Sequence, residues 1–185
     1  MKKHPILNEI FDFIKMIIIS FIFVHILTTF IVRPVQVVGP SMHPTLKDAQ
    51  LGITNIISLK MNGIQRYDVV VAKLDMNEEL IVKRVVGMPY DTICCIDGVI
   101  YINGEAIDEY YLDETYVFSQ AQLEKDKKFT KDFDEVTLGE DEYFLLGDNR
   151  LHSTDSRVFG AFKEEDIVSK SVYVWYPFNE MSVVK

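Results

Sequence analysis

The sequence predicts an all-β domain of antiparallel sheets, preceded by one N-terminal transmembrane helix. Residues 16–32 form a run of 17 residues without a formal charge, and short strand patterns separated by tight turns follow it. No stretch rich in Pro, Gly or Ser divides the rest of the 185-residue chain, which suits one domain with a short appendage. We expect a short cytoplasmic N-terminus at 1–15, an anchor at 16–32 and a β-domain at 33–185.

The uncharged run is close to the lower limit for a helix that spans a bilayer, which needs roughly 17–25 apolar residues. Lys15 and Arg33 bracket it and can extend to the two interfaces. A cleavable signal peptide is the alternative, but its apolar region is shorter, about 7–15 residues, and a small-residue cleavage site follows it. Here Phe30-Ile31-Val32-Arg33-Pro34 follows instead, so we expect an uncleaved anchor rather than a signal peptide or a buried core helix.

Charge is distributed unevenly along the chain. The formal net charge is −9, to which residues 1–33 contribute +2 and the remainder −11. Nucleic-acid binding is excluded, because a phosphate-binding face needs a basic patch that this acidic body lacks. Three lysines precede the span, whereas Arg33 and Lys47 follow it, so the positive-inside bias is slight. It favours a single-pass protein of the cell membrane, with the N-terminus in the cytoplasm and the body outside.

The body contains several strand patterns and one charged segment. The alternation of apolar residues and the Asp97-Gly98 pair, which supplies the positive φ angles of a hairpin turn, predict two neighbouring strands, and Asn103-Gly104 predicts another turn. The charge-dense segment 120–135 is interpreted as a mobile surface insertion with one helical turn. The predicted strands are 35–38, 67–74, 79–86 (after a polar turn at 75–78), 91–96, 99–102, 143–146 and 167–176.

Lys83 stands in the middle of an apolar strand. Side chains alternate between the two faces of a strand, so Lys83 shares a face with Ile81 and Val85. Burial among such neighbours disfavours the charged ammonium and lowers its pKa. A neutral lysine can accept a proton, which is the task of a general base. A solvated lysine that discourages pairing of an edge strand is the alternative.

Ser41 lies in a turn that proline restrains. Pro40 and Pro44 fix φ on either side, and Gly39 allows close approach of the backbone. A rigid, exposed turn suits a nucleophile, because its positional entropy is removed before the reaction. Taken alone, the segment fits a structural turn between anchor and domain equally well.

Arg84 lies on the strand face opposite Lys83, so at least one of these cations needs a buried partner. The run from Gly147 to Gly160 offers partners, since it holds two aspartates, two arginines and three hydroxyl groups directly after a predicted strand. It ends in an arginine followed by apolar residues, so we expect it to fold back onto the core. Of its aspartates, Asp155 is the expected partner of Arg84.

Four segments in order resemble bacterial type I signal peptidases of the Gram-positive type, which are membrane-bound leader peptidases with a Ser/Lys dyad. They are Ser41-Met42-His43-Pro44-Thr45-Leu46, Arg66-Tyr67-Asp68-Val69-Val70, the segment from Lys83 to Asp91, and Gly147-Asp148-Asn149-Arg150 with the polar residues after it. The resemblance extends from the anchor to Trp175-Tyr176-Pro177-Phe178. It implies the antiparallel β-fold of that family.

The resemblance also implies roles for single residues. Ser41 would be the nucleophile and Lys83 the general base, and the Ser41 N–H would be one donor to the oxyanion. Some relatives have a serine hydroxyl as second donor at the position of Gly39, so here a backbone group is expected. A supporting polar network would consist of Arg84, Asp148, Asp155 and Arg157, with Ser153 orienting the lysine ammonium.

Two residues depart from the family's pattern or suggest another reading. Tyr67 stands where the second segment usually has glycine in this family, so the backbone conformation there is expected to differ. His43 suggests a Ser/His triad, but a histidine two residues from its serine is badly placed as a base. We expect it to have a role in packing or at the surface.

The activity implied is a serine endopeptidase that removes N-terminal signal peptides from secreted preproteins, with small residues at P1 and P3. Its partners would be those signal peptides and the lipid bilayer, and it would use no metal or organic cofactor. A non-catalytic assembly chaperone, for example in pilus formation, is the first alternative and predicts loss of the serine or the lysine. A self-cleaving repressor would carry a helix-turn-helix in place of the span, and a generic anchored β-domain leaves the four segments unexplained.

Overall fold

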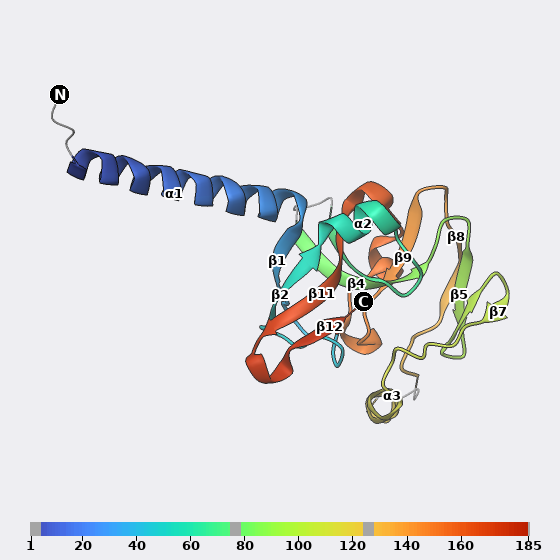
Figure 1. The fold of residues 1–185 in the computed structure, drawn as a ribbon. Coiled ribbons are helices and arrows are strands. Elements are labelled where there is room, and N and C mark those ends of the chain that lie inside the picture. The colour runs from blue at the N-terminus through green and yellow to red at the C-terminus, as the bar shows by residue number, and fades with distance from the viewer. Residues whose placement is uncertain (1–4, 75–78, 124–127, 185) are drawn as a thin grey trace.

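The structure is a computed structural model that describes residues 5–74, 79–123 and 128–184. Helix α1 (Pro5–Phe30) projects from a body built of two antiparallel sheets (Figure 1). The stretch Glu9–Phe30 of this helix has a mean hydropathy of 2.3 and no buried residues in its apolar window, so by length and composition it could cross a membrane. The predicted all-β fold with one apolar N-terminal helix is confirmed.

The helix has different bounds from the expected anchor, 16–32. It begins at Pro5, whose fixed φ suits a first helical position, and continues through Glu9, Asp12 and Lys15, because a charged residue does not stop a helix. At the other end, Val32 already lies in strand β1 (Val32–Gln36). Pro34 disfavours helical backbone at Arg33, the residue before it, so the helix has to end before that position.

The larger sheet has the strand order β1-β2-β11-β3-β4-β9-β10, and β12 pairs with β11. The smaller sheet has the order β7-β6-β5-β8. The bounds in the larger sheet are β2 Leu51–Asn55, β3 Val69–Leu74, β4 Glu79–Gly87, β9 Glu142–Leu146, β10 Phe162–Lys163, β11 Ile167–Tyr176 and β12 Ser182–Val184. Those in the smaller sheet are β5 Thr92–Ile96, β6 Val99–Ile102, β7 Glu105–Ala106 and β8 Phe133–Thr137.

Short helices connect these strands: α2 (Ile56–Asn62), α3 (Glu114–Ala121) and α4 (Ser156–Phe159), with single 3₁₀ turns η1 (Arg150–His152), η2 (Glu164–Asp166) and η3 (Phe178–Glu180). The β5–β6 hairpin is confirmed, with Asp97 and Gly98 at φ of 52° and 81°. The predicted strands in β3, β4, β9 and β11 are confirmed within two residues, whereas the predicted turn 75–78 lies outside the described residues. The predicted strand 35–38 is misplaced, since β1 ends at Gln36.

The predicted surface insertion at 120–135 is exposed or half-buried at most of its described residues, but Phe129 and Thr130 are buried and β8 pairs with β5. Its centre, 124–127, lies outside the described residues. The single predicted helical turn is instead the two-turn helix α3, which mostly precedes the segment. The charged residues of this stretch gave no sign that Thr130 is buried. Its Oγ1 accepts a hydrogen bond of 3.0 Å from the buried Arg150. Strand β2 and helix α2 were not predicted.

Three apolar clusters hold the body together. One lies within the larger sheet around Val70, Val85 and Leu145, and a second joins the two sheets around Ile93 and Phe144. The third brings Val37, Met42 and Leu46 of the segment after β1 against Val69, Val172 and Val174. This last cluster fixes the turn that contains Ser41.

Candidate active site

Ser41 and Lys83, 42 positions apart in the chain, meet beside strand β4. Lys83 Nζ lies 2.9 Å from Ser41 Oγ and also donates to the carbonyl of Val82 at 3.1 Å. Lys83 is only 3% exposed, so its ammonium is almost out of water. The hydroxyl and the amine therefore have the separation that a nucleophile and its base need.

The serine turn is held by burial of its neighbours rather than by its prolines alone. Met42 and Leu46 are buried in the third core cluster on the C-terminal side of Ser41. On the N-terminal side, Gly39 lies at φ +79° and donates its N–H to Asp48 Oδ1 at 2.7 Å. Ser41 itself stays half-buried and faces Lys83.

Burial lowers the pKa of Lys83 to about 8. The nearby carboxylates of Asp155 and Asp148 oppose this effect, whereas the Arg157 guanidinium reinforces it. The amine is thus neutral in a substantial fraction of molecules near pH 8, where a solvated lysine would be fully charged.

Arg84 binds Asp148, and the expected pairing with Asp155 is wrong. Arg84 Nε and Nη2 donate to the two oxygens of Asp148 at 2.9 and 2.7 Å, and Arg84 Nη1 donates to the Tyr67 carbonyl at 2.8 Å. The register explains the choice, because Arg84 is opposite Leu146 in the β4–β9 ladder and Asp148 follows two residues later. Thr45 Oγ1 also donates to Asp148 at 2.5 Å, which ties the serine turn to the same carboxylate.

Asp155 binds Arg157, the second arginine of its own loop. Arg157 Nε and Nη2 each lie 2.8 Å from a carboxylate oxygen, and the Gly147 N–H donates to Asp155 Oδ2 at 3.0 Å. Burial alone would raise the pKa of Asp155, but the bonds from Arg157 and Gly147 bring it below its ordinary value. Asp155 also caps helix α4, so it stabilises the loop that packs behind the serine turn.

Ser153 belongs to the same loop, and its side chain does not form the expected hydrogen bond with Lys83. Its Oγ is buried, and no contact within the described residues has the geometry of a hydrogen bond, although the hydroxyl is close enough to help lower the pKa of Asp155. Between Ser153 and Ser41 lies Gly147. A Cβ added at Gly147 would lie 2.2 Å from Ser153 Oγ and 2.5 Å from the Ser41 carbonyl oxygen.

Tyr67 has a backbone conformation that is typical of glycine. Its φ is +74°, in the left-handed region that side chains rarely adopt. The ring packs edge-on against Tyr110 and at a tilt against Tyr111, with centroid distances of 5.4 and 5.1 Å. Tyr111 in turn lies 4.3 Å from the Arg84 guanidinium. These contacts hold a backbone that tyrosine alone would not favour.

Sequence reasoning missed the network around Arg150. This buried arginine forms an ion pair with Glu109, donates to the Gly147 carbonyl at 3.0 Å and binds the Tyr111 hydroxyl at 3.0 Å. Burial would lower the pKa of Arg150, but Glu109 raises it above its usual value. A buried Arg150 needs an acidic partner, but nothing in the sequence distinguished Glu109 from the other carboxylates nearby.

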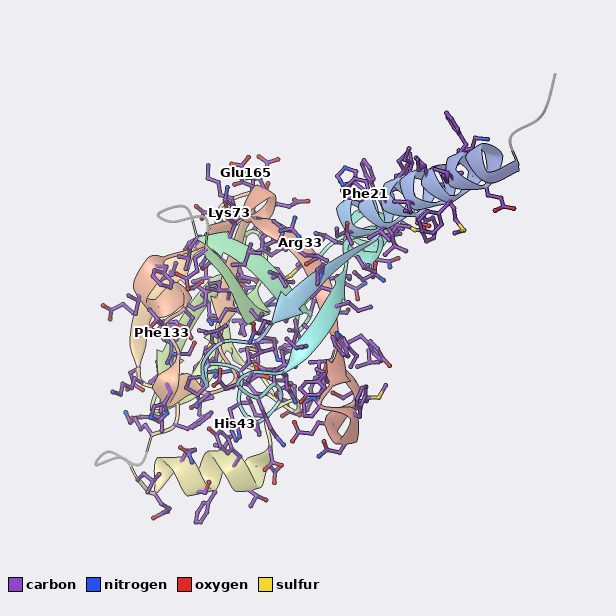
Figure 2. All side chains as sticks on the ribbon, turned by 90° about the vertical axis from the view of Figure 1, so that its left-hand side faces the viewer. Phe21, Arg33, His43, Lys73, Phe133 and Glu165 are labelled. Carbon is purple, nitrogen blue, oxygen red and sulfur yellow. The ribbon has the colours of Figure 1, made fainter. Side chains whose placement is uncertain are left out.

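His43 packs against Tyr116 of α3, with ring centroids 5.0 Å apart, and its side chain has no hydrogen bond within the described residues. In Figure 2 it lies on the side of the body next to α3. The packing role expected for His43 is confirmed. Among the described residues there is also no group of three His, Cys, Asp or Glu side chains that could hold a metal ion.

A small cleft of about 90 Å³ leads to the serine and the lysine. Its walls are Gln36–Val38 with Ser41 and Met42 on one side, and Glu79–Lys83 of β4 on the other. Along 79–83, strand β4 pairs with β3, whereas its ladder with β9 begins only at Arg84. The opposite edge of this part of β4 is thus unpaired in the described chain.

A serine hydrogen-bonded to a buried lysine is an arrangement that hydrolases of more than one fold use. Comparison with known proteins identifies the family. Residues 10–176 match the family described as "Signal peptidase, peptidase S26", and the chain belongs to this family.

Two curated relatives cover nearly the whole chain. Signal peptidase IB of Staphylococcus aureus (strain COL) is 35% identical over 178 residues, which are 94% of this chain and 93% of the relative. Signal peptidase I of Bacillus licheniformis is 34% identical, over 94% of this chain and 92% of its own. The crystal structure of a signal peptidase I from Enterococcus faecalis V583 aligns with a TM-score of 0.51 at 32% identity, covering 58% of this chain and 95% of that one.

Replacing Glu109 by Gln should destabilise the protein by roughly 3–5 kcal/mol, because it leaves the Arg150 charge buried without its partner. Chemical denaturation of the variant and the parent measures this difference. Glu105→Gln, at an exposed carboxylate of β7, is the matched control and should change stability little. Equal stability of Glu109→Gln and Glu105→Gln would show that the pair with Arg150 is not important for folding.

Proposed function

We propose that this peptidase removes N-terminal signal peptides from secreted preproteins, with Ser41 as nucleophile and Lys83 as general base. The observation that supports this most directly is the 2.9 Å contact between Ser41 Oγ and Lys83 Nζ. The lowered pKa of Lys83, about 8, adds to it, because only the neutral amine can take the serine proton. The family and the two curated relatives give the class of substrate.

In the first half of the reaction, Lys83 accepts the proton of Ser41 as its oxygen attacks the scissile carbonyl. The resulting tetrahedral intermediate collapses when the amine of the leaving chain takes a proton from the Lys83 ammonium, and an ester to Ser41 remains. In the second half, neutral Lys83 removes a proton from a water molecule, which attacks the ester. Ser41 regains its proton from Lys83, and the signal peptide leaves as a carboxylic acid.

The Ser41 N–H is the first proposed donor to the oxyanion, since no acceptor is bonded to it within the described residues. Gly39 offers no hydroxyl, and its N–H is already bonded to Asp48. Pro40 has no N–H to give. The second proposed donor is a backbone group outside 39–41.

The supporting network keeps the dyad in place from two sides. Asp148 joins Arg84, next to the base, to Thr45 of the serine turn, and the Asn149 N–H donates to the Ser41 carbonyl at 3.0 Å. Asp155 and Arg157 stabilise the loop that presents Gly147 to the turn. We propose that Ser153, whose hydroxyl is buried close by, turns toward the Lys83 ammonium during the reaction and orients it.

The cleft suits a substrate with small side chains at P1 and P3. An extended peptide can pair with the unpaired edge of β4 and place alternate side chains against Leu80, Ile81 and Val82. A volume of about 90 Å³ accommodates small side chains and excludes bulky ones.

The location follows from helix α1. We propose that it anchors the chain in the cell membrane with the N-terminus in the cytoplasm and the β-domain outside, where secreted preproteins present their cleavage sites. Anchoring restricts enzyme and substrate to one surface and raises their effective concentration. No cofactor is part of the proposed mechanism.

Ser41→Ala and Lys83→Met should each abolish cleavage of a preprotein in detergent while the β-domain stays folded, because a nucleophile and its base act as a unit. Lys83→Arg should be equally inactive, since a guanidinium keeps its proton in this range. Circular dichroism of each variant is the control for folding. Robust processing by Lys83→Arg would exclude lysine as the base.

The value of kcat/KM should rise with pH, reach half its maximum near pH 8 and level off above that, because the pKa of Lys83 in the free enzyme is lowered to about 8 and only the neutral amine is active. The assay is a pH profile of kcat/KM for the parent and for His43→Ala. A rise centred near pH 6.5 that disappears in His43→Ala would instead identify His43 as the base.

Gly147→Ala should lower kcat/KM by roughly 100-fold, because the added Cβ meets the Ser41 carbonyl oxygen at 2.5 Å and displaces the turn. Gly139→Ala is the matched control, since its Cβ would meet only the flexible Glu142 side chain, at 3.3 Å. Both variants are assayed for cleavage and for thermal unfolding. Parental activity in Gly147→Ala would show that the contact with the serine turn is not required.

A further inference from the structure

A second, larger groove lies on the segment that contains α3. It has a volume of about 560 Å³ and is here called the α3 groove. It is lined by the apolar and aromatic residues Tyr110, Leu112, Val117, Phe118 and Ala121 and by the acidic residues Asp108, Glu109 and Glu114.

One face of helix α3 lines the groove, and its side chains there are exposed or half-buried. Glu114, Val117, Phe118 and Ala121 have the spacing of one helix face, and no residue of α3 is buried. Phe118 is 68% exposed and Tyr110 is 72% exposed, so two large aromatic rings face water in one depression. The opposite face is occupied, because Tyr116 packs on His43 and Phe129.

All charged residues that line the groove are acidic. Residues 105–121 contain five carboxylates and neither lysine nor arginine. Two of these have structural partners, since Glu109 pairs with Arg150 and Asp113 caps α3. Asp108 and Glu114 form no ion pair within the described residues, so their charges are available to a ligand.

The segment that contains α3 contacts the segments that carry the dyad at two points. Tyr116, on the face of α3 opposite the groove, packs on His43, two residues after Ser41. Tyr110, which lines the groove, packs on Tyr67, whose carbonyl binds Arg84, the neighbour of Lys83. Figures 1 and 2 show α3 on the side of the body away from α1.

This placement distinguishes the two ends of a substrate. A signal peptide leads back to the bilayer, so the part before the scissile bond has to run toward the anchor through the cleft between 36–38 and 79–83. The part after the scissile bond leaves Ser41 in another direction. The α3 groove is available to it on the far face of α3, whose near face packs on His43 of the serine turn.

We propose that the α3 groove binds the segment of the preprotein that follows the scissile bond, and that it favours apolar side chains flanked by Lys or Arg. This inference rests on the proposed function. Charge argues against two other occupants. A second copy has a net charge of −11 after residue 33, so the acidic residues of the groove would repel it. The same residues would repel an anionic membrane.

The test uses two preproteins with the same signal peptide and the same first few mature residues. Downstream, one carries a Phe/Lys-rich segment and the other a Ser/Asp-rich segment. The parent should cleave the Phe/Lys-rich preprotein with a higher kcat/KM, mainly through a lower KM. Phe118→Ser should reduce the ratio of the two kcat/KM values by about tenfold, as expected when an aromatic contact is lost. Glu114→Lys should reverse the preference at low salt.

Two controls separate the groove from the rest of the surface. Met61→Ser removes an exposed apolar side chain of α2, and Glu105→Lys reverses a charge on β7, so both should keep the parental ratio. A ratio near one in the parent, or an equal change in control and groove variants, would overturn the proposal. So would a change in sedimentation of Phe118→Ser, which would assign the groove to a second copy. If the parent cleaved neither preprotein at a rate above Ser41→Ala, the proposed function itself would fail.

Discussion

The removal of the Lys83 amine from water is the constraint on which the rest of the structure depends. An ammonium loses its hydration in such a place, and that loss brings its pKa down to about 8. Full pairing with a carboxylate would reverse the effect, because an opposite charge in contact favours the protonated amine. The structure avoids this by giving each nearby acid an arginine of its own: Asp148 binds Arg84, and Asp155 binds Arg157. The lysine is left with a hydroxyl and a carbonyl as its neighbours.

The same arrangement explains why the loop after β9 contains two acid–arginine pairs close together. Asp148 connects strand β4 to the serine turn through Arg84 and Thr45. Gly147 sits so close to Ser41 and Ser153 that no side chain fits there. The position of the serine is thus determined by backbone contacts and charge-assisted hydrogen bonds from three segments. Such contacts are stiff, and a nucleophile that is held in place loses little entropy in the reaction.

Much of this could be predicted from the sequence, where a local pattern decides the structure. The hairpin at Asp97-Gly98, the apolar helix and the burial of Lys83 all follow from periodicity and turn chemistry. The partner of Arg84 could not be predicted, because the register of β4 against β9 includes a shift between Val85 and Gly87 that no local pattern records. Charge density at 120–135 misled for a similar reason, since a polar segment can still provide a buried anchor such as Thr130.

Arg150 connects the segment 105–121, which contains α3, to the loop behind the dyad. Through Glu109 and Tyr111 it holds one wall of the α3 groove, and through the Gly147 carbonyl it holds the loop behind Ser41. Tyr111 also covers the Arg84 guanidinium, and Tyr67 keeps a left-handed backbone under the two neighbouring rings. A strained residue persists only where its surroundings over-determine it. Here the rings that restrain Tyr67, those of Tyr110 and Tyr111, belong to the segment that contains α3, and the Tyr67 carbonyl accepts a hydrogen bond from Arg84 beside Lys83.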